Sequence, residues 1–308
     1  MTEAYQSIIE RCAGLAPLRT AVVHPVRHTV FEAVEEARAA GLIEPVLVGP
    51  ASRIAAALAE AGLAVEDYEI VDAEHSHAAA ARAAAMAGIG QVGAIMKGSL
   101  HSDELLGAVI DPAAGLRTER RVSHAFLMLT EDYPRPFIIT DAAVNIAPDL
   151  SAKADILCNA IALWHVLWGP ALPNVAILAA VETVSPKMQA TLDAAALCKM
   201  ADRGQIAGAV LDGPLAFDNA VSLAAAQEKG IVSPVGGQAE ILLVPDIESG
   251  NMLAKQLIFL GGADAAGIVL GARVPIMLTS RADSVRARML STALAVLMAE
   301  ARRLGRVK

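Results

Sequence analysis

The chain has 308 residues, which is more than one ordinary hydrophobic core holds, so we expect two domains. Hydrophobic residues make up 55% of it and aromatic residues only 3%, a composition typical of a well-buried globular protein and not of a disordered one. The net charge of -8 argues against a nucleic-acid-binding surface, although a few local Arg and Lys residues can still hold a small anion.

The cysteines and the apolar stretches bear on the cellular compartment. The three cysteines are scattered and form no C-x-x-C pair, so we expect neither a zinc site nor a disulfide framework but reduced thiols in a cytoplasmic protein. The polar N-terminal residues do not resemble a signal peptide. The most apolar helical stretch, Ile156 to Trp168, contains Asn159 and His165, so we interpret it as a buried helix and expect no membrane span. The cysteines are Cys12, Cys158 and Cys198.

Short apolar segments alternate with amphipathic helical patterns along the first hundred residues. This order predicts α/β layers built around a parallel sheet. Gly41, which follows the first helical pattern, is typical of a helix end. The predicted strands cover residues 20–24, 44–49 and 93–96, and the predicted helices cover residues 30–40, 52–61 and 78–87.

Two later pairs of strands are close enough in sequence to form hairpins, which predicts a mixed sheet. They are residues 123–129 with 137–140, and 267–271 with 274–278. Between them, strands are predicted at 174–181, 207–211 and 239–244, and helices at 149–168, 185–203, 217–229 and 251–260. If both hairpins belong to one sheet, the chain divides into domain I, residues 1–145 and 262–308, and an inserted domain II, residues 146–261.

A small basic loop follows the predicted strand 93–96 at the start of a predicted helix. Its sequence is Lys97-Gly98-Ser99-Leu100-His101-Ser102-Asp103, which lacks the spacing of a Walker loop. Because a helix N-terminus attracts anions, Lys97, the Gly98 backbone and His101 are candidates to line an anion or thioester pocket. The alternatives are a surface turn and, for His101, a structural histidine.

Arginines are densest in the segment Gly115-Leu116-Arg117-Thr118-Glu119-Arg120-Arg121. Its three guanidinium groups are able to clamp a phosphate through paired hydrogen bonds. A solvated connector between two elements is the alternative interpretation.

A second strand-to-helix corner occurs near the C-terminus. The apolar run 274–278 ends in Thr279-Ser280-Arg281, and Asp283 or Ser284 is then expected to cap a last helix that continues to about residue 303. The helix start supplies free N–H groups, to which a hydroxyl and a guanidinium add further anion-binding groups. We therefore predict an anion site at Ser280 and Arg281. The alternative is that Ser280 merely ends a strand and that Arg281 is solvated.

Several segments, in the same order, resemble the phosphate acetyl/butyryltransferase family over nearly the whole chain from about residue 20. Three of them, Lys97-Gly98, Gly115-Leu116-Arg117 and Asp212-Gly213-Pro214, look closer to the butyryl branch than to the acetyl branch. The other matching segments are Ser123-His124-Ala125, Ser185-Pro186-Lys187-Met188, Leu215-Ala216-Phe217-Asp218, Pro245-Asp246, Gly250-Asn251 with Lys255, and Ser280-Arg281.

The resemblance implies two α/β domains of the isocitrate/isopropylmalate dehydrogenase kind, with an active site in the cleft between them. It implies reversible transfer of a short-chain acyl group between coenzyme A and phosphate, in a homodimer built on the inserted domain and without a permanently bound cofactor or metal. Ser280 is then expected to bind the oxyanion of the tetrahedral centre, and Arg281 the leaving phosphate. The residues expected to bind substrate are Lys97, Gly98, His101, Arg117, Asn251 and Lys255.

Three positions depart from the pattern of the acetyl branch. Ala287 stands where that branch carries its catalytic Asp, and Ala108 and Gln238 stand where it carries arginines. Asp283 is the nearest acid able to act as the missing base, unless the local positive field alone activates the thiol of coenzyme A.

Two other functions remain open from the sequence. A metal-dependent dehydrogenase of the same fold would need clustered carboxylates, whereas Asp212, Asp218 and Asp246 form no D-x-x-x-D pattern. A non-catalytic sensor of acyl-coenzyme A agrees with the three departures but not with the retained Ser280-Arg281.

Overall fold

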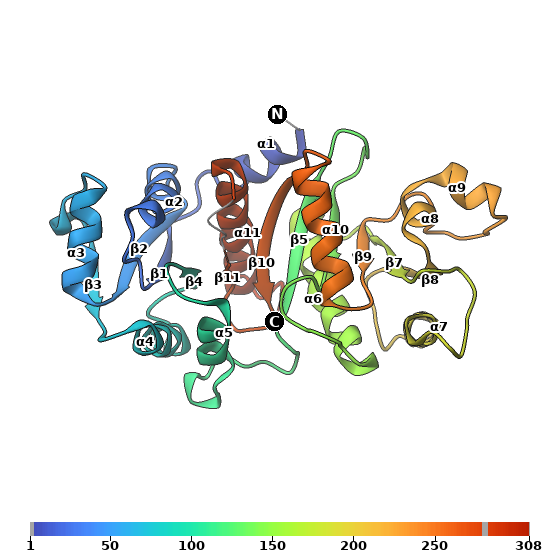
Figure 1. Cartoon of the computed structure of the whole chain (residues 1–308), viewed down its shortest axis with the longest axis horizontal. Coiled ribbons are helices and arrows are strands. Elements are labelled where there is room, and N and C mark those ends of the chain that lie inside the picture. The colour runs from blue at the N-terminus through green and yellow to red at the C-terminus, as the bar shows by residue number, and fades with distance from the viewer. Residues whose placement is uncertain (1–2, 279–282, 308) are drawn as a thin grey trace. The chain divides into compact units, whose positions relative to one another are not determined.

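The structure is a computed structural model that describes residues 3–278 and 283–307 (Figure 1). The chain forms two compact units. The first unit comprises Glu3–Arg120 and the chain from Ala266 onward, and the second unit comprises Arg121–Ala265. Each unit contains a sheet with helices packed against it, which confirms the expected α/β class.

The sheet of the first unit has the strand order β3-β2-β1-β4-β11-β10. All neighbouring strands are parallel except β10 and β11, which form the expected antiparallel hairpin with Val269 opposite Ile276. The strands are β1 (Leu18–Val23), β2 (Ile43–Gly49), β3 (Glu69–Asp72), β4 (Ala94–Lys97), β10 (Asp264–Leu270) and β11 (Ile276–Met277). The helices are α1 (Glu3–Glu10), α2 (His28–Ala39), α3 (Ala51–Glu60), α4 (Ser76–Gly88), α5 (Ser102–Ile110) and α11 (Val285–Arg303).

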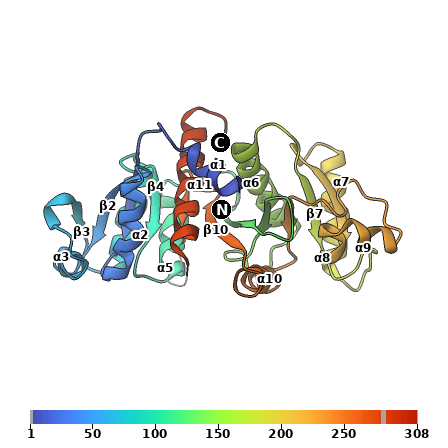
Figure 2. The same cartoon turned by 90° about the horizontal axis from the view of Figure 1, so that it is seen from above.

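The order of these strands creates a topological switch point. From β1 the chain proceeds outward to β2 and β3, and then returns to place β4 on the other side of β1. Helix α4 packs over β1 and β2, whereas α2 and α11 lie side by side (Figure 2). In open α/β sheets, ligands bind outside the carboxyl ends of the strands at such a point. The topology therefore predicts a ligand site at the carboxyl ends of β1 and β4.

The sheet of the second unit has the strand order β5-β6-β9-β7-β8. Strands β5 and β6 form the other expected hairpin, and the remaining neighbours are parallel. The strands are β5 (Ser123–Leu129), β6 (Phe137–Thr140), β7 (Asn174–Leu178), β8 (Val210–Leu215) and β9 (Ile241–Leu243). The helices are α6 (Leu150–Trp168), α7 (Gln189–Asp202), α8 (Phe217–Val221), α9 (Leu223–Glu228) and α10 (Ile247–Phe259).

The boundary between the units differs from the expected one. The hairpin β5–β6 was expected in the first domain, but it belongs to the second unit because β6 pairs with β9, with Ile139 opposite Leu242. These residues share one buried cluster with Ala176 of β7 and Ala254 of α10. The core of the second unit therefore begins with β5, immediately after the arginine-rich segment.

Two predicted helices of the second unit are wrong in detail. The helix expected from Ser185 starts only at Gln189, because Thr191 ties the preceding segment into a loop: its hydroxyl donates to the carbonyl of Ser185 and accepts from the Ser185 N–H. The single helix expected over residues 217–229 is two helices, α8 and α9. They separate at Ser222, which has an extended backbone and accepts a hydrogen bond from the N–H of Ala225.

Helix α6 is the helix among the described residues whose length and apolar composition would let it cross a membrane. Within its most apolar window, 56% is buried inside the structure. It also carries two buried polar residues, Lys153, which forms an ion pair with Asp193, and Asn159, whose amide donates to the hydroxyl of Ser123. This packing is that of a core helix, which agrees with the expectation from the sequence.

Candidate functional site

The carboxyl ends of β1 and β4 are joined by backbone hydrogen bonds. The N–H of Gly98 donates to the carbonyl of Val23, and the N–H of Ser99 donates to the carbonyl of His24, both at 3.0 Å. The ring Nδ1 of His24 lies 3.1 Å from the Ser99 carbonyl oxygen. His24 is a described non-glycine residue with a positive φ, 55°, a conformation found most often at turns and functional sites. The two strand ends therefore form one tightly connected corner.

Gly98 is required in this corner by the close approach of the two strands. A Cβ atom at position 98 would lie 2.3 Å from the carbonyl oxygen of Val23 and 3.1 Å from the carbonyl carbon of His24. Both neighbours are backbone atoms, which cannot turn away as a side chain can. The glycine that the sequence marks as a backbone anion ligand thus has a packing role at the same position.

Replacing Gly98 with Ala should therefore separate the ends of β1 and β4. We expect a loss of stability of about 1–3 kcal/mol, the usual effect of forcing an extra atom into a packed site. A thermal melt of the variant checks the stability, and Gly107→Ala is the matched control, because a Cβ at position 107 meets no atom within 4 Å. A melting temperature for Gly98→Ala equal to that of the control would contradict this packing.

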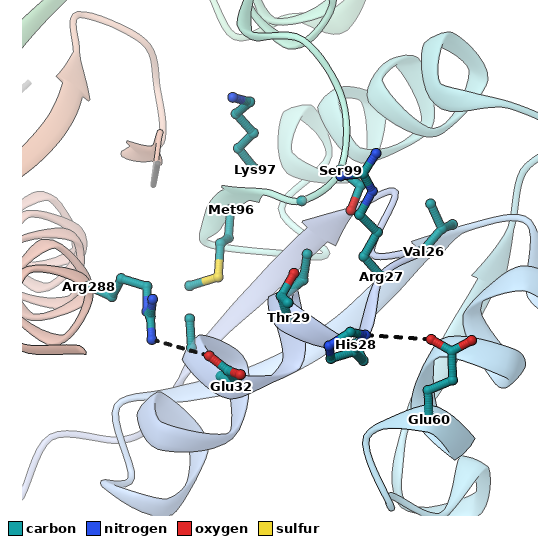
Figure 3. A pocket seen from close by; sticks show the side chains of 13 residues that line it. Val26, Arg27, His28, Thr29, Glu32, Glu60, Met96, Lys97, Ser99 and Arg288 are labelled. Atoms are coloured by element: carbon teal, nitrogen blue, oxygen red, sulfur yellow. Dashed lines mark ion pairs between the residues drawn. The ribbon is translucent and has the colours of Figure 1, made fainter. Parts of the chain in front are cut away.

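A pocket of about 460 Å³ opens beside this corner (Figure 3). Its walls come from the end of β4, the segment joining β1 to α2, the first turns of α2, the end of α3 and the start of α11. Met96 and Lys97 are consecutive in β4 and extend to opposite sides in Figure 3, as neighbours in a strand do. The lining residues are Val26, Arg27, His28, Thr29, Val30, Glu32, Ala33, Glu60, Met96, Lys97, Gly98, Ser99 and Arg288. The pocket thus occupies the switch point of the sheet.

The start of α2 makes this pocket favourable for an anion. The residue before the helix, Arg27, gives it no side-chain cap, and the first turn carries no acidic residue. The first backbone N–H groups of a helix lack intrahelical partners and carry its positive dipole end. Lys97 and Arg288 add positive charge, while Glu32 and Glu60 oppose it, the latter paired with His28 at 3.5 Å. The pocket therefore combines cationic groups and backbone donors with an apolar wall.

The two residues predicted to act in catalysis, Ser280 and Arg281, lie outside the described residues. Strand β11 pairs in parallel with β4, with Met277 opposite Met96. Leu278 therefore follows Met277 in the same direction as Lys97 follows Met96. On the C-terminal side, the carbonyl of Asp283 accepts a hydrogen bond of 2.9 Å from Nη1 of Arg288. The described neighbours on both sides are thus linked to elements that line the pocket.

The cap of α11 is Ser284 and not Asp283. The hydroxyl oxygen of Ser284 accepts a hydrogen bond of 3.1 Å from the N–H of Ala287. The side chain of Asp283 is therefore not used as the helix cap, which was the structural alternative to a catalytic role for it.

Two other predicted substrate residues of the first unit are not among the residues that line the pocket. His101 precedes α5, and its exposed side chain makes no cap to that helix. Arg117 is also exposed and forms an isolated antiparallel bridge with Ala272. Beside it, the hydroxyl of Thr118 donates to the carbonyl of Gly271 at 2.6 Å. The arginine-rich motif thus ties its segment to the turn between β10 and β11.

The remaining predicted substrate residues, Asn251 and Lys255, lie on α10 in the second unit. The amide of Asn251 donates to the carbonyl of Ala142 at 3.1 Å, while Lys255 is exposed. The neighbouring motif residue Asp246 caps α10, because its carboxylate accepts from the N–H of Ser249 at 2.8 Å. Asp246 and Asn251 thus have structural roles as well as matching the family motif.

The Ser123-His124-Ala125 motif also lies inside the second unit. His124 is 2% exposed, and its burial lowers the pKa of the imidazole to about 4, although the nearby Asp141 carboxylate opposes this shift. The imidazole is therefore neutral at pH 7. Its ring packs against that of Phe126 with a centroid distance of 4.3 Å. This histidine packs as a core residue within its unit.

Two of the three cysteines, Cys12 and Cys198, do not have the properties of nucleophiles. Burial raises the pKa of the Cys12 thiol to about 11, and burial together with Asp212 and Asp202 raises that of Cys198 to about 12. A thiol reacts as its thiolate, so both groups are almost entirely unreactive at pH 7. These two groups are thus poorly suited to carry an acyl group covalently.

Sequence patterns did not reveal the pocket-lining side chains Met96 and Arg288 or the segment from Val26 to Thr29. Because the residue before α2 provides no side-chain cap, the sequence contains no clear helix-start signal there, and α2 was predicted to begin two residues late. Arg288 lies on the side of α11 that packs beside α2, a relation that only the fold supplies. Among the described residues, no three His, Cys, Asp or Glu side chains group as metal ligands would.

The chain matches known proteins over most of its length. The family model described as phosphate acetyl/butaryl transferase matches residues 77–296. A phosphate acetyltransferase of Rhizobium meliloti is 56% identical over 303 residues, which are 98% of this chain and 96% of that protein. A phosphate acetyltransferase of Rickettsia prowazekii is also 56% identical, over 94% of this chain and 82% of that protein.

A relative named phosphate butyryltransferase is less similar than these two. A phosphate butyryltransferase of Clostridium acetobutylicum is 39% identical over 97% of this chain and 99% of that protein. These whole-chain identities contradict the expectation of a closer likeness to the butyryl branch. That expectation rested on three short motifs and not on the whole chain.

A solved structure has the same fold. A branched-chain phosphotransacylase from Enterococcus faecalis V583 superimposes with a TM-score of 0.80 at 26% identity, over 92% of this chain and 99% of that one. The family model covers residues 77–296, the sequence identity and the fold extend over nearly the whole chain, and the chain therefore belongs to the phosphate acetyl/butaryl transferase family.

Proposed function

We propose that this protein is a phosphate acyltransferase that moves a short acyl group reversibly between coenzyme A and phosphate. The observation that supports it best is the pocket at the carboxyl ends of β1 and β4, where Lys97, Arg288 and the start of α2 surround an opening of about 460 Å³. Both substrates of such a reaction carry phosphate groups, which fit a pocket rich in cations and backbone donors. The 56% identity to proteins named phosphate acetyltransferase favours acetyl phosphate as the acyl donor.

The proposed step is direct attack of the thiolate of coenzyme A on the carbonyl carbon of the acyl phosphate. A carbon–sulfur bond forms, the bond between that carbon and the bridging phosphate oxygen breaks, and the electron pair leaves with phosphate. The thiol proton goes to a base or to solvent. Since a free thiol has a pKa of about 8.5, a positive site raises the fraction of thiolate at neutral pH. No covalent enzyme intermediate is needed.

The roles of Ser280, Arg281 and Asp283 belong to this proposal. Ser280 binds the oxyanion that forms at the carbonyl oxygen, and Arg281 binds the phosphate that leaves. Asp283 is the proposed base, since Ser284 and not Asp283 caps α11. In support, Leu278 follows β11, the strand that pairs with β4, and the backbone carbonyl of Asp283 accepts a hydrogen bond from the pocket residue Arg288. His101, Arg117, Asn251 and Lys255 are retained as proposed substrate contacts on the strength of the family motifs alone.

The assembly and location of the protein are also proposals. We propose a homodimer formed through the second unit, in the cytoplasm, that uses coenzyme A as a substrate and holds no permanent cofactor. The exposed apolar side chains Met252, Phe259 and Leu260 on and beside α10 support an interface there, because exposed apolar surface favours association. Molar mass in solution, measured by light scattering, tests the dimer.

The function is tested by mixing the purified protein with coenzyme A and acyl phosphates from acetyl to valeryl, and following thioester formation. We expect turnover, with acetyl phosphate among the best donors. Binding of coenzyme A without turnover of any acyl phosphate would instead identify a sensor and overturn the proposal.

A further inference from the structure

We propose that Arg288 binds the phosphate group of the acyl phosphate, and inorganic phosphate in the reverse reaction. This inference rests on the proposed function. Arg288 lies near the start of α11 and lines the pocket together with Met96 and Lys97 of β4. In Figure 3 its side chain reaches from α11 toward Glu32 on α2.

The guanidinium of Arg288 is held in place but has donors left over. Its side chain is 13% exposed, and Nη1 donates to the carbonyl of Asp283 at 2.9 Å. Its Nε is buried and has no hydrogen-bond partner among the described residues. Nη2 lies 3.8 Å from a carboxylate oxygen of Glu32 and 3.9 Å from one of Glu36, which exceeds hydrogen-bond length. One edge of the guanidinium, Nε with Nη2, therefore lacks an acceptor at bonding distance among residues 3–278 and 283–307.

That edge has the geometry that phosphate recognition uses. A guanidinium binds two oxygens of one phosphate through parallel N–H groups, and such charge-assisted pairs are stronger than neutral hydrogen bonds. Because a buried polar group without a partner is rare in a folded protein, Nε of Arg288 points to a ligand. The other groups nearby, Lys97 and the uncapped start of α2, favour an anion as well.

Glu32 and Glu36 are the groups that oppose an anion at Arg288. The side chain of Glu32 is 61% exposed, so it is able to turn toward solvent when phosphate binds. Glu36 is less exposed, at 32%, and one of its carboxylate oxygens is buried without a hydrogen bond to the described part of the chain. At nearly 4 Å, both carboxylates offset the charge of Arg288 without occupying its donors. Removal of the charge of the exposed competitor by Glu32→Gln should therefore lower the KM for phosphate.

The test compares Arg288→Gln with Arg286→Gln, which changes the same residue type two positions earlier in α11. Arg286 serves as control because its guanidinium lies 4.1 Å from the ring centre of Tyr5 and it does not line the pocket. We measure the KM for inorganic phosphate with acetyl-coenzyme A, the KM for acetyl-coenzyme A itself, and binding of inorganic phosphate by calorimetry. Arg288→Lys keeps the charge but not the paired donors, and serves if Arg288→Gln fails to fold.

Arg288→Gln should raise the KM for inorganic phosphate about tenfold or more and leave that for acetyl-coenzyme A within about twofold. Arg288→Lys should show a smaller rise, and Arg286→Gln none. An unchanged phosphate KM in both Arg288 variants overturns the proposal. So does a rise confined to acetyl-coenzyme A, which would mean that Arg288 binds a phosphate of coenzyme A.

The calorimetric measurement of phosphate binding distinguishes a failure of this proposal from a failure of the proposed function. If the wild-type protein binds inorganic phosphate but turns over no acyl phosphate, the proposed function fails. Loss of that binding in Arg288→Gln would still uphold the role of Arg288. Equal binding by the wild-type protein and both Arg288 variants, or no binding by the wild-type protein, would overturn it.

Discussion

Replacing Arg281 with Ala should lower kcat/KM for acyl phosphate and coenzyme A about 100-fold or more, the usual loss when a group that stabilises transition-state charge is removed. The proposed role of Arg281 is to neutralise the phosphate as the carbon–oxygen bond breaks, so the charge it binds grows along the reaction. We therefore expect kcat to fall with kcat/KM. Arg281→Lys should retain part of the activity, since an ammonium keeps the charge but not the paired hydrogen bonds.

The chain offers a matched control for this change. Ser52-Arg53 repeats the Ser-Arg dipeptide in the first turn of α3, the helix that follows β2, and Arg53 is exposed and does not line the pocket. Arg53→Ala should keep wild-type activity. Activity of Arg281→Ala close to that of the wild type, or an equal loss in both variants, would contradict the assignment of Arg281.

The second large effect concerns stability and not catalysis. Asp193→Ala should lower the unfolding free energy of the second unit by about 3–5 kcal/mol, because it leaves the charge of Lys153 buried without its partner. Nζ of Lys153 lies 2.6 Å from the Asp193 carboxylate, and the two side chains are only 6% and 7% exposed. The other carboxylate oxygen accepts from the amide of Gln189 at 2.8 Å, so this bond is lost as well.

An exposed pair on the same helix provides the comparison. Lys199 and Asp202 are also 2.6 Å apart, but their side chains are 65% and 63% exposed. Since water screens such a pair, Asp202→Ala should cost about 0.5 kcal/mol or less. The joint change Lys153→Met with Asp193→Leu should restore most of the stability lost in Asp193→Ala, because it removes both charges.

The measurement uses a natural probe of the second unit. The chain has two tryptophans, and both lie on α6, Trp164 beside Trp168 with ring centres 4.1 Å apart. Their fluorescence during urea unfolding therefore follows the second unit. If Asp193→Ala unfolds at the same urea concentration as Asp202→Ala, the buried pair of Lys153 and Asp193 does not make the predicted contribution to the unfolding free energy.

The order of the elements was largely predictable from the sequence, because apolar runs, helix caps and glycines mark them locally. Both hairpins and the caps Asp149 and Ser222 follow local rules, although the break at Ser222 was overlooked. Strand β3 was missed, since it has only four residues and none of them is buried, so its sequence lacks an apolar run. The predicted boundary between the units was misplaced because it depends on the pairing of β6 with β9, which joins residues about a hundred positions apart. Local sequence patterns do not reveal such a pairing.

The candidate site was only half predictable for the same reason. Lys97 and Gly98 follow the predicted strand 93–96, so sequence alone located them at a strand end; Lys97 ends β4, and both residues line the pocket. Arg288 lies inside a regular helix, where nothing in the local pattern separates it from a surface arginine. Its place in the pocket depends on the packing of α11 beside α2, which is a property of the folded unit.

The initial rate of acetyl-coenzyme A formation from acetyl phosphate, in the wild-type protein and in Lys97→Ala, tests the assignment of function and pocket together. Lys97 is intermediate in exposure and lines the pocket, so its loss should leave the melting temperature nearly unchanged. We predict ready thioester formation by the wild-type protein and a kcat/KM at least about tenfold lower in Lys97→Ala. No thioester from the wild-type protein with any acyl phosphate would contradict the function, and full activity in Lys97→Ala would contradict the pocket.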